Sequence, residues 1–148
     1  MKIAKALKLK NQLAGDVAKL KERLAQQNSR PAKQKFDYDN RQVLSELRAK
    51  IDELVRVKAA VAAANTPLYD QIFRLAELKG LVTALNGLAT KAGVFSEGSA
   101  LSMSSREVEY VAQLGKVDID GLVAELNLEI QALQDALDEA NHTRTVDL

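Results

Sequence analysis

Few residues of this chain have the types and spacing that catalysis or metal binding requires. His142 is the only histidine, and as a general base or a metal ligand it would need carboxylate or histidine partners held in place around it. The helical pattern of the C-terminal region stops near residue 140. We therefore expect His142 to be an exposed residue of a polar tail, and not part of a site.

Three carboxylates lie close together near the end of the chain, at Asp135, Asp138 and Glu139. A di-iron site in a helical bundle would require two Glu-x-x-His motifs, and a chain with a single histidine cannot supply such a pair. We interpret these carboxylates as a solvated acidic face, or as the partner of a basic helix.

Glycines and serines gather between residues 93 and 105. Gly93 and Gly98 lack the following Lys-Ser/Thr of a phosphate-binding loop, and no His or Lys relay is placed to activate a serine. The serines in question are Ser96, Ser99, Ser102, Ser104 and Ser105. The sequence thus predicts no enzyme activity: we expect no catalytic residue, no cofactor, no metal and no small-molecule substrate.

Charge is divided between the two ends of the chain. Residues 1–35 carry ten Lys/Arg and two acids, whereas residues 118–148 carry eight acids and one Arg. The basic end, with Phe36 and Tyr38 beside loop lysines, could bind phosphate backbones. The acidic end offers a near-equal opposite charge, so we favour pairing of the two ends, within one chain or between copies, over nucleic acid.

Apolar residues recur at alternating spacings of three and four in four segments, the pattern of helices that pack along a seam. We predict helices over about 2–27, 39–64, 67–92 and 119–140. Asp37 or Asp39 and then Asp118 are expected as N-caps, and Thr66-Pro67 as the start of the third helix. The expected seam of the second helix comprises Leu44, Leu47, Ile51, Leu54, Lys58 and Val61.

The segment near 107–114 has a different pattern, in which apolar and polar residues alternate as in a strand. A single strand cannot form a sheet, so it needs a partner, which could lie in another copy of the chain. Residues 93–105 are expected to be irregular.

Together these patterns predict an all-α fold: a four-helix antiparallel bundle of coiled-coil-like hairpins with a short extended segment, forming a single helical domain over residues 1–148. Aromatic residues make up only 4% of the chain, as in elongated helical proteins. The wide apolar face of the third helix and the unpartnered extended segment predict a homo-oligomer. No apolar run approaches the ~20 residues of a membrane span, and no signal peptide is recognised, so we expect a soluble cytoplasmic protein.

The chain resembles the septicolysin-like family of small bacterial helical proteins. The resemblance rests on the opening run 1–7 leading into 20–24, the break at 64–66, the extended 107–111 before 117–119, and the ending 130–148. Where that family often has a Trp near the end, this chain has His142. The resemblance implies an all-helical, oligomeric protein and supplies no catalytic or binding residue.

We therefore expect a non-enzymatic helical structural or interaction protein that associates with itself. The alternative, indicated by the family name, is a membrane-active, cytolysin-like protein whose Lys-rich amphipathic helices bind anionic lipid. Nucleic-acid binding is a third class and is not favoured.

Overall fold

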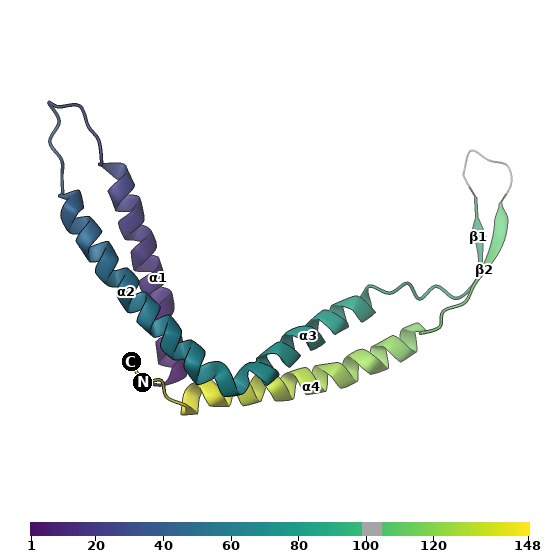
Figure 1. Cartoon of the computed structure of the whole chain (residues 1–148). Helices are drawn as coiled ribbons and strands as arrows, with labels where there is room; N and C mark the ends of the chain where they lie inside the picture. The colour runs from purple at the N-terminus through teal and green to yellow at the C-terminus, as the bar shows by residue number, and fades with distance from the viewer. Residues whose placement is uncertain (99–104) are drawn as a thin grey trace. The chain divides into compact units, whose positions relative to one another are not determined.

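The computed structural model describes residues 1–98 and 105–148, which are mainly helical with a small two-stranded sheet (Figure 1). The predicted all-α class is therefore confirmed in its main feature. A single four-helix bundle is not confirmed, because the chain divides into two compact units, one formed by Met1–Tyr69 with Leu137–Leu148 and one by Asp70–Ala136. A single domain over residues 1–148 stays a prediction, since a compact unit need not fold by itself.

The first unit is built on a hairpin of two long helices, α1 (Ile3–Gln26) and α2 (Asn40–Asn65). Their existence and bounds match the predicted 2–27 and 39–64. The buried side chains of α1, including Leu13, Val17 and Leu20, follow the three-four spacing on which this helix was predicted. Both helices contribute to one hydrophobic cluster that also includes Val146.

The seam of α2 matches the prediction at Leu47, Leu54 and Val61, which are buried, and differs by one residue at two other positions. Val43 and Val57 are buried, whereas Leu44 is 47% exposed and Lys58 is exposed. Both sets of residues have heptad spacing, so periodicity alone did not separate them. The chosen register keeps the Lys58 ammonium in water, which avoids the large cost of burying an unpaired charge.

The end of the chain, predicted to be a polar tail, is paired with the beginning of the chain. The Ile3 amide donates to the Arg144 carbonyl at 3.1 Å, and the Val146 amide donates to the Met1 carbonyl at 2.7 Å. Val146 is only 3% exposed. Its burial in the hydrophobic cluster of the first unit, together with these backbone hydrogen bonds, fixes the tail there.

The apolar face of the basic helix α1 is packed against α2, so this face is not available for the predicted pairing with the acidic C-terminal helix. Only the region from Leu137 onward belongs to the same unit as α1. Two helices joined by the short loop 27–39 are close neighbours from the start. The apolar seam between them also outweighs surface ion pairs, which contribute ~0.2–1 kcal/mol each.

The second unit contains two helices that lie side by side (Figure 1), α3 (Tyr69–Asn86) and α4 (Lys116–Thr143). The Arg74 Nε donates to Glu129 Oε1 at 2.7 Å across this pair, and Leu75 and Ile119 are buried in the unit. A 3-10 turn over Thr66–Leu68 precedes α3 and contains Pro67. The predicted helix 67–92 is therefore too long: α3 ends before Gly87, a residue type that favours helix ends.

The bounds of α4 also differ from the prediction of 119–140. The helix begins at Lys116, so Asp118 lies in its first turn and is not the N-cap, although its Oδ2 accepts from the Gly115 amide at 3.0 Å. At the other end the helix continues to Thr143. His142 therefore belongs to the last turn of α4 and not to a tail.

Two short strands form an antiparallel hairpin between α3 and α4 in the sequence. Strand β1 (Gly93–Glu97) pairs with β2 (Arg106–Tyr110), with Phe95 opposite Val108. The predicted extended segment near 107–114 is thus confirmed over 107–110, whereas residues 111–114 are not part of the strand. Its partner lies in the same chain and not in another copy, and the prediction that residues 93–97 are irregular is wrong. Ser99, Ser102 and Ser104 lie outside the described residues.

Candidate functional site

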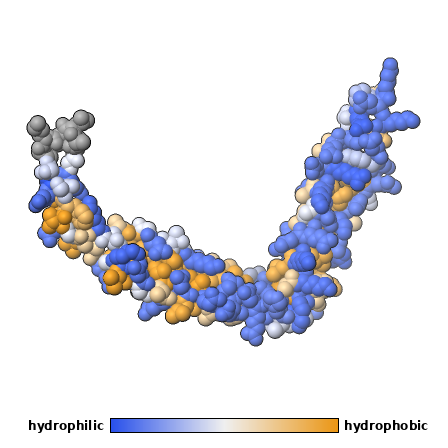
Figure 2. All heavy atoms as spheres, turned by 180° about the vertical axis from the view of Figure 1, so that it is seen from behind, coloured by the Kyte–Doolittle hydropathy of each residue, from blue (hydrophilic) through white to orange (hydrophobic). Residues whose placement is uncertain are grey.

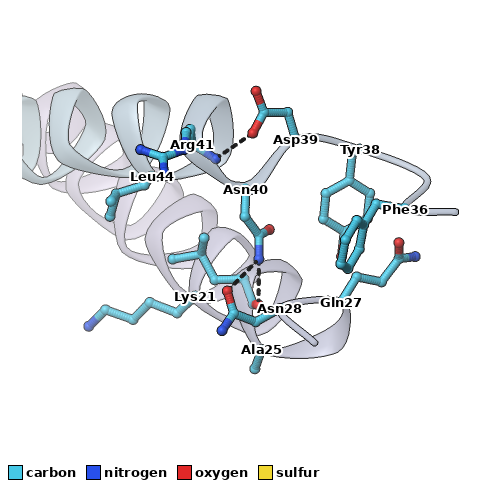
Figure 3. Close-up of a pocket in the computed structure, with 11 residues that line it drawn as sticks. Lys21, Ala25, Gln27, Asn28, Phe36, Tyr38, Asp39, Asn40, Arg41 and Leu44 are labelled. Carbon is cyan, nitrogen blue, oxygen red and sulfur yellow. Dashed lines mark hydrogen bonds between the residues drawn. The ribbon is translucent and has the colours of Figure 1, made fainter. Parts of the chain in front are cut away.

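An open hollow lies where α1 ends and α2 begins, and its walls come from both helices and from the loop 27–39 (Figure 3). Its volume is about 1240 Å³, above the ~300–1,000 Å³ usual for small-molecule pockets, as expected of a hollow that is open to solvent. Leu24 and Leu44 line it with apolar surface, and Lys21 and Arg41 bring positive charge.

The loop that closes this hollow is held by specific hydrogen bonds. The Tyr38 hydroxyl donates to the Arg23 carbonyl at 2.6 Å, and the Arg23 guanidinium lies 4.4 Å from the centre of the Tyr38 ring. Gln27 and Asp37 bond twice, because the Gln27 amide donates to Asp37 Oδ2 at 2.6 Å and the Asp37 backbone amide donates to Gln27 Oε1 at 2.8 Å. The geometry of the hollow is therefore fixed by its own residues.

Asn40, the first residue of α2, links the two walls of the hollow. Its Nδ2 donates to the Leu24 carbonyl at 3.0 Å and to Asn28 Oδ1 at 3.3 Å, as Figure 3 shows. Its Oδ1 is buried and has no hydrogen-bond partner within residues 1–98 and 105–148. Asp39 caps the helix, because its Oδ1 accepts from the Arg41 amide at 2.8 Å, and this confirms Asp39 as one of the two predicted caps.

The end of the α1–α2 hairpin at the loop 27–39 carries excess positive charge, because its two aspartates, Asp37 and Asp39, already interact with other groups of the loop and of α2. Asp37 lies 3.5 Å from the Arg30 guanidinium, and Asp39 caps α2. Within the described part of the chain no ion pair involves Lys21, Arg41, Lys33 or Lys35. The Phe36 side chain is 54% exposed beside them. Such a surface can accept an anionic group next to an apolar one.

The two aromatic residues predicted to interleave with the loop lysines both reach this hollow, but they differ in role. Tyr38 is occupied by Arg23, whereas Phe36 has a free face. Not all of the predicted basic patch lies here, since Lys2 donates to the Thr143 carbonyl near the chain ends. Sequence reasoning missed Gln27 and Asn40; the cluster of Asn, Gln and Asp between two helices was the signal that could have identified them.

A second cluster lies on the β-hairpin, around Lys91. Its ammonium lies 4.4 Å from the ring centres of both Phe95 and Tyr110 and 3.5 Å from Glu97 Oε1. The Tyr110 hydroxyl bonds to Glu97, which lowers the pKa of Glu97 and raises that of Tyr110, with Lys91 further lowering the pKa of Glu97. Because every member bonds another, this cluster holds the hairpin together.

Of the residues considered for chemistry, those in the described part of the chain each have local contacts and are not gathered around a common point. His142 Nδ1 lies 2.7 Å from the Asp138 carbonyl oxygen, which can only accept, so Nδ1 carries the proton. Asp135 accepts from the Gln131 amide at 2.8 Å. Across residues 1–98 and 105–148 no three His, Cys, Asp or Glu residues are placed to hold a metal. Of the described serines, Ser96 lies in β1 and Ser105 precedes β2.

No family model, curated protein or solved structure matches this chain. The resemblance to the septicolysin-like family therefore stays a prediction. Among the described helices, none is long and apolar enough to cross a membrane.

Proposed function

We propose that this chain is a non-enzymatic, cytoplasmic helical interaction protein of the septicolysin-like type, and that it associates with copies of itself. The observation that carries the proposal is the exposure of large apolar side chains in the second unit. Figure 2 displays hydrophobic surface along this unit and a mostly hydrophilic surface along the α1–α2 hairpin. The side chains concerned include Leu81, Leu88, Leu122, Val117 and Leu128, which are 38–84% exposed.

A layer of two helices explains this exposure. Among the described residues of Asp70–Ala136, only Leu75 and Ile119 are buried large apolar residues. Two helices can cover only one face of each other, so apolar residues on the remaining faces stay in water until another surface covers them. A second copy of the chain is present wherever the first one is, and it carries the same exposed apolar surface. We therefore expect this surface to be covered by self-association.

Sedimentation equilibrium tests this proposal with the wild-type chain at roughly micromolar to millimolar concentration. We expect an average mass that rises above the monomer mass of 16.2 kDa. Val117 and Leu128 are 84% and 75% exposed, so the double variant Val117→Gln/Leu128→Gln should keep the fold and weaken association. Val55→Gln on α2, a residue 58% exposed, is the matched control. A wild-type chain that stays monomeric at every concentration would overturn the proposal.

A second candidate function, binding to anionic lipid, is favoured by one observation at the hairpin end. Phe36 is 54% exposed, and Lys33 and Lys35 beside it have no ion-pair partner among the described residues. Apolar anchors flanked by lysines suit the surface of an anionic membrane. The apolar face of α1 is packed against α2, so insertion of α1 itself would first require the hairpin to open.

Vesicles distinguish this candidate from the first. Binding and leakage of vesicles with anionic lipid, absent with neutral lipid and lost in Phe36→Ser/Lys33→Glu/Lys35→Glu, would favour the membrane. The control Lys79→Glu carries a reversed charge on α3 outside the hairpin. Wild-type protein that neither binds nor permeabilises anionic vesicles would exclude the membrane candidate.

A further inference from the structure

Two faces of opposite charge carry residues that form no ion pair among the described residues: Lys8 and Lys19 on α1, and Glu125 and Asp135 on α4, although Asp135 accepts a hydrogen bond from Gln131 of its own helix. Within residues 1–98 and 105–148 no ion pair involves any charged residue of α1. Lys5, Lys8 and Lys19 of α1 are all exposed.

Two of the exposed lysines of α1, Lys8 and Lys19, lie on one face of the helix. Lys8 and Lys19 are eleven residues apart, which is close to three turns at ~3.6 residues per turn. Relative to the buried Leu13 and Val17, this places both lysines on the side of α1 that points away from α2. Gly15 lies on the same side, and a Cβ built at this glycine would meet no atom within 4 Å. A neighbouring helix can therefore approach α1 here.

The helix α4 has an acidic face of matching spacing. Glu125 and Asp135 are exposed, and ten residues separate them, about 2.8 turns and roughly 15 Å along the helix, close to the roughly 16 Å between Lys8 and Lys19. Both lie on the side of α4 opposite the half-buried Val123 and Leu126. Leu128, 75% exposed, lies between them on that side.

We propose that the basic face of α1 in one copy docks antiparallel on the acidic face of α4 in a second copy. This inference rests on the self-association proposed above and names the faces that meet. In antiparallel register, Lys8 falls near Asp135 and Lys19 near Glu125. The same register brings Leu128 against the open surface at Gly15. The near-zero net charge of the chain, +1, fits two faces that neutralise each other.

Charge exchange between copies tests the docking. One variant reverses the charges on the basic face of α1 (Lys8→Glu/Lys19→Glu), and another reverses those on the acidic face of α4 (Glu125→Lys/Asp135→Lys). At about 50 mM salt we expect each variant alone to associate at least about tenfold more weakly than the wild type, because like charges then meet. An equimolar mixture of the two should recover association as a mixed complex, since every pair is again of opposite sign.

The control reverses two exposed charges on α2 (Arg48→Glu/Lys58→Glu) with the same change in net charge, and it should associate as the wild type does. Circular dichroism of each variant verifies that the helices are retained. A wild type that self-associates while both reversals leave its Kd unchanged, or a mixture that recovers nothing, overturns the docking and leaves self-association standing. A monomeric wild type overturns both. Weakening by the α1 reversal alone would indicate that another acidic surface or partner meets α1, and it also overturns the docking.

Discussion

Truncating Leu13 should separate the stability of the α1–α2 hairpin from that of the rest of the chain. Leu13 lies near the middle of α1, is 1% exposed, and belongs to the hydrophobic cluster shared with α2. Replacing a fully buried Leu by Ala costs ~2–5 kcal/mol, with the lower values where the surroundings can relax into the space. A hairpin of two helices can relax in this way, so we expect Leu13→Ala to cost about 2–3 kcal/mol.

Hydrogen exchange followed by mass spectrometry measures this cost helix by helix. At about 1.4 kcal/mol for each factor of ten, the variant should open the hairpin roughly 30 to 150 times more often. Amides of α1 and α2 should exchange faster by that factor. Peptides from α3 should change far less, because α3 from Asp70 onward lies in the other compact unit.

The exposed Val55 of α2 supplies the control for this experiment. It is 58% exposed, so Val55→Ala should stay within about 0.5 kcal/mol of the wild type. A loss below about 1 kcal/mol in Leu13→Ala, or faster exchange in α1 without any change in α2, would refute the assignment of α2 as the partner of α1.

Three further outcomes follow from single interactions. Glu97 has a lowered pKa and Tyr110 a raised one in the folded hairpin. The Glu97 contribution to stability is therefore present above its unfolded pKa and lost as pH falls through the folded value, whereas that of Tyr110 is present below pH ~10 and lost as pH rises through its folded value. NMR shifts of the β-hairpin should be constant near neutral pH and change at both extremes, and Glu97→Gln should remove the acid limb; a hairpin insensitive to pH would contradict this. Tyr38→Phe removes the hydrogen bond to the Arg23 carbonyl but keeps the ring under the guanidinium, and thermal unfolding should report a loss of ~0.5–1.5 kcal/mol; no loss would mean that the loop is held by other contacts. Asp39→Ala removes the cap of α2 and should cost ~1 kcal/mol, while Asp39→Asn should retain most of it; equal losses in the two variants would contradict the capping role.

The sequence by itself determined where most helices lie. The three-four spacing of apolar residues located α1 and α2 to within a residue or two, because a helix that packs on one side needs this periodicity whatever its partner. Alternation located β2 in the same way. Asp39 was identified as a possible cap because a short carboxylate before a helical pattern can bond the free amides of the first turn.

The ends of helices and the short strand β1 were harder to predict from the local sequence pattern. The apolar spacing continues past Asn86, so the pattern predicted helix where Gly87 ends it. Strand β1 was missed because its five residues stand among glycines and serines and acquire strand structure only by pairing with β2. The hollow at the hairpin end was only half predicted: Phe36 and Tyr38 were identified from their type, but Asn40 and Gln27 matter because of the distances that folding sets.

Only the tertiary structure decided which helix packs on which. A seam of Leu and Val specifies a buried face but fits almost any similar seam, so periodicity could not choose between α2 and α4 as the partner of α1. The opposite charges of the chain ends favoured α4, but exposed ion pairs contribute ~0.2–1 kcal/mol each, whereas each fully buried Leu or Val contributes ~1.5–3 kcal/mol. The short loop 27–39 keeps α2 close to α1 along the chain. The buried side chains of Val43, Leu47 and Val57 then supply the apolar contacts on the α2 side. The charged residues of α1 form no ion pair within the hairpin, so they stay available for contacts with other surfaces.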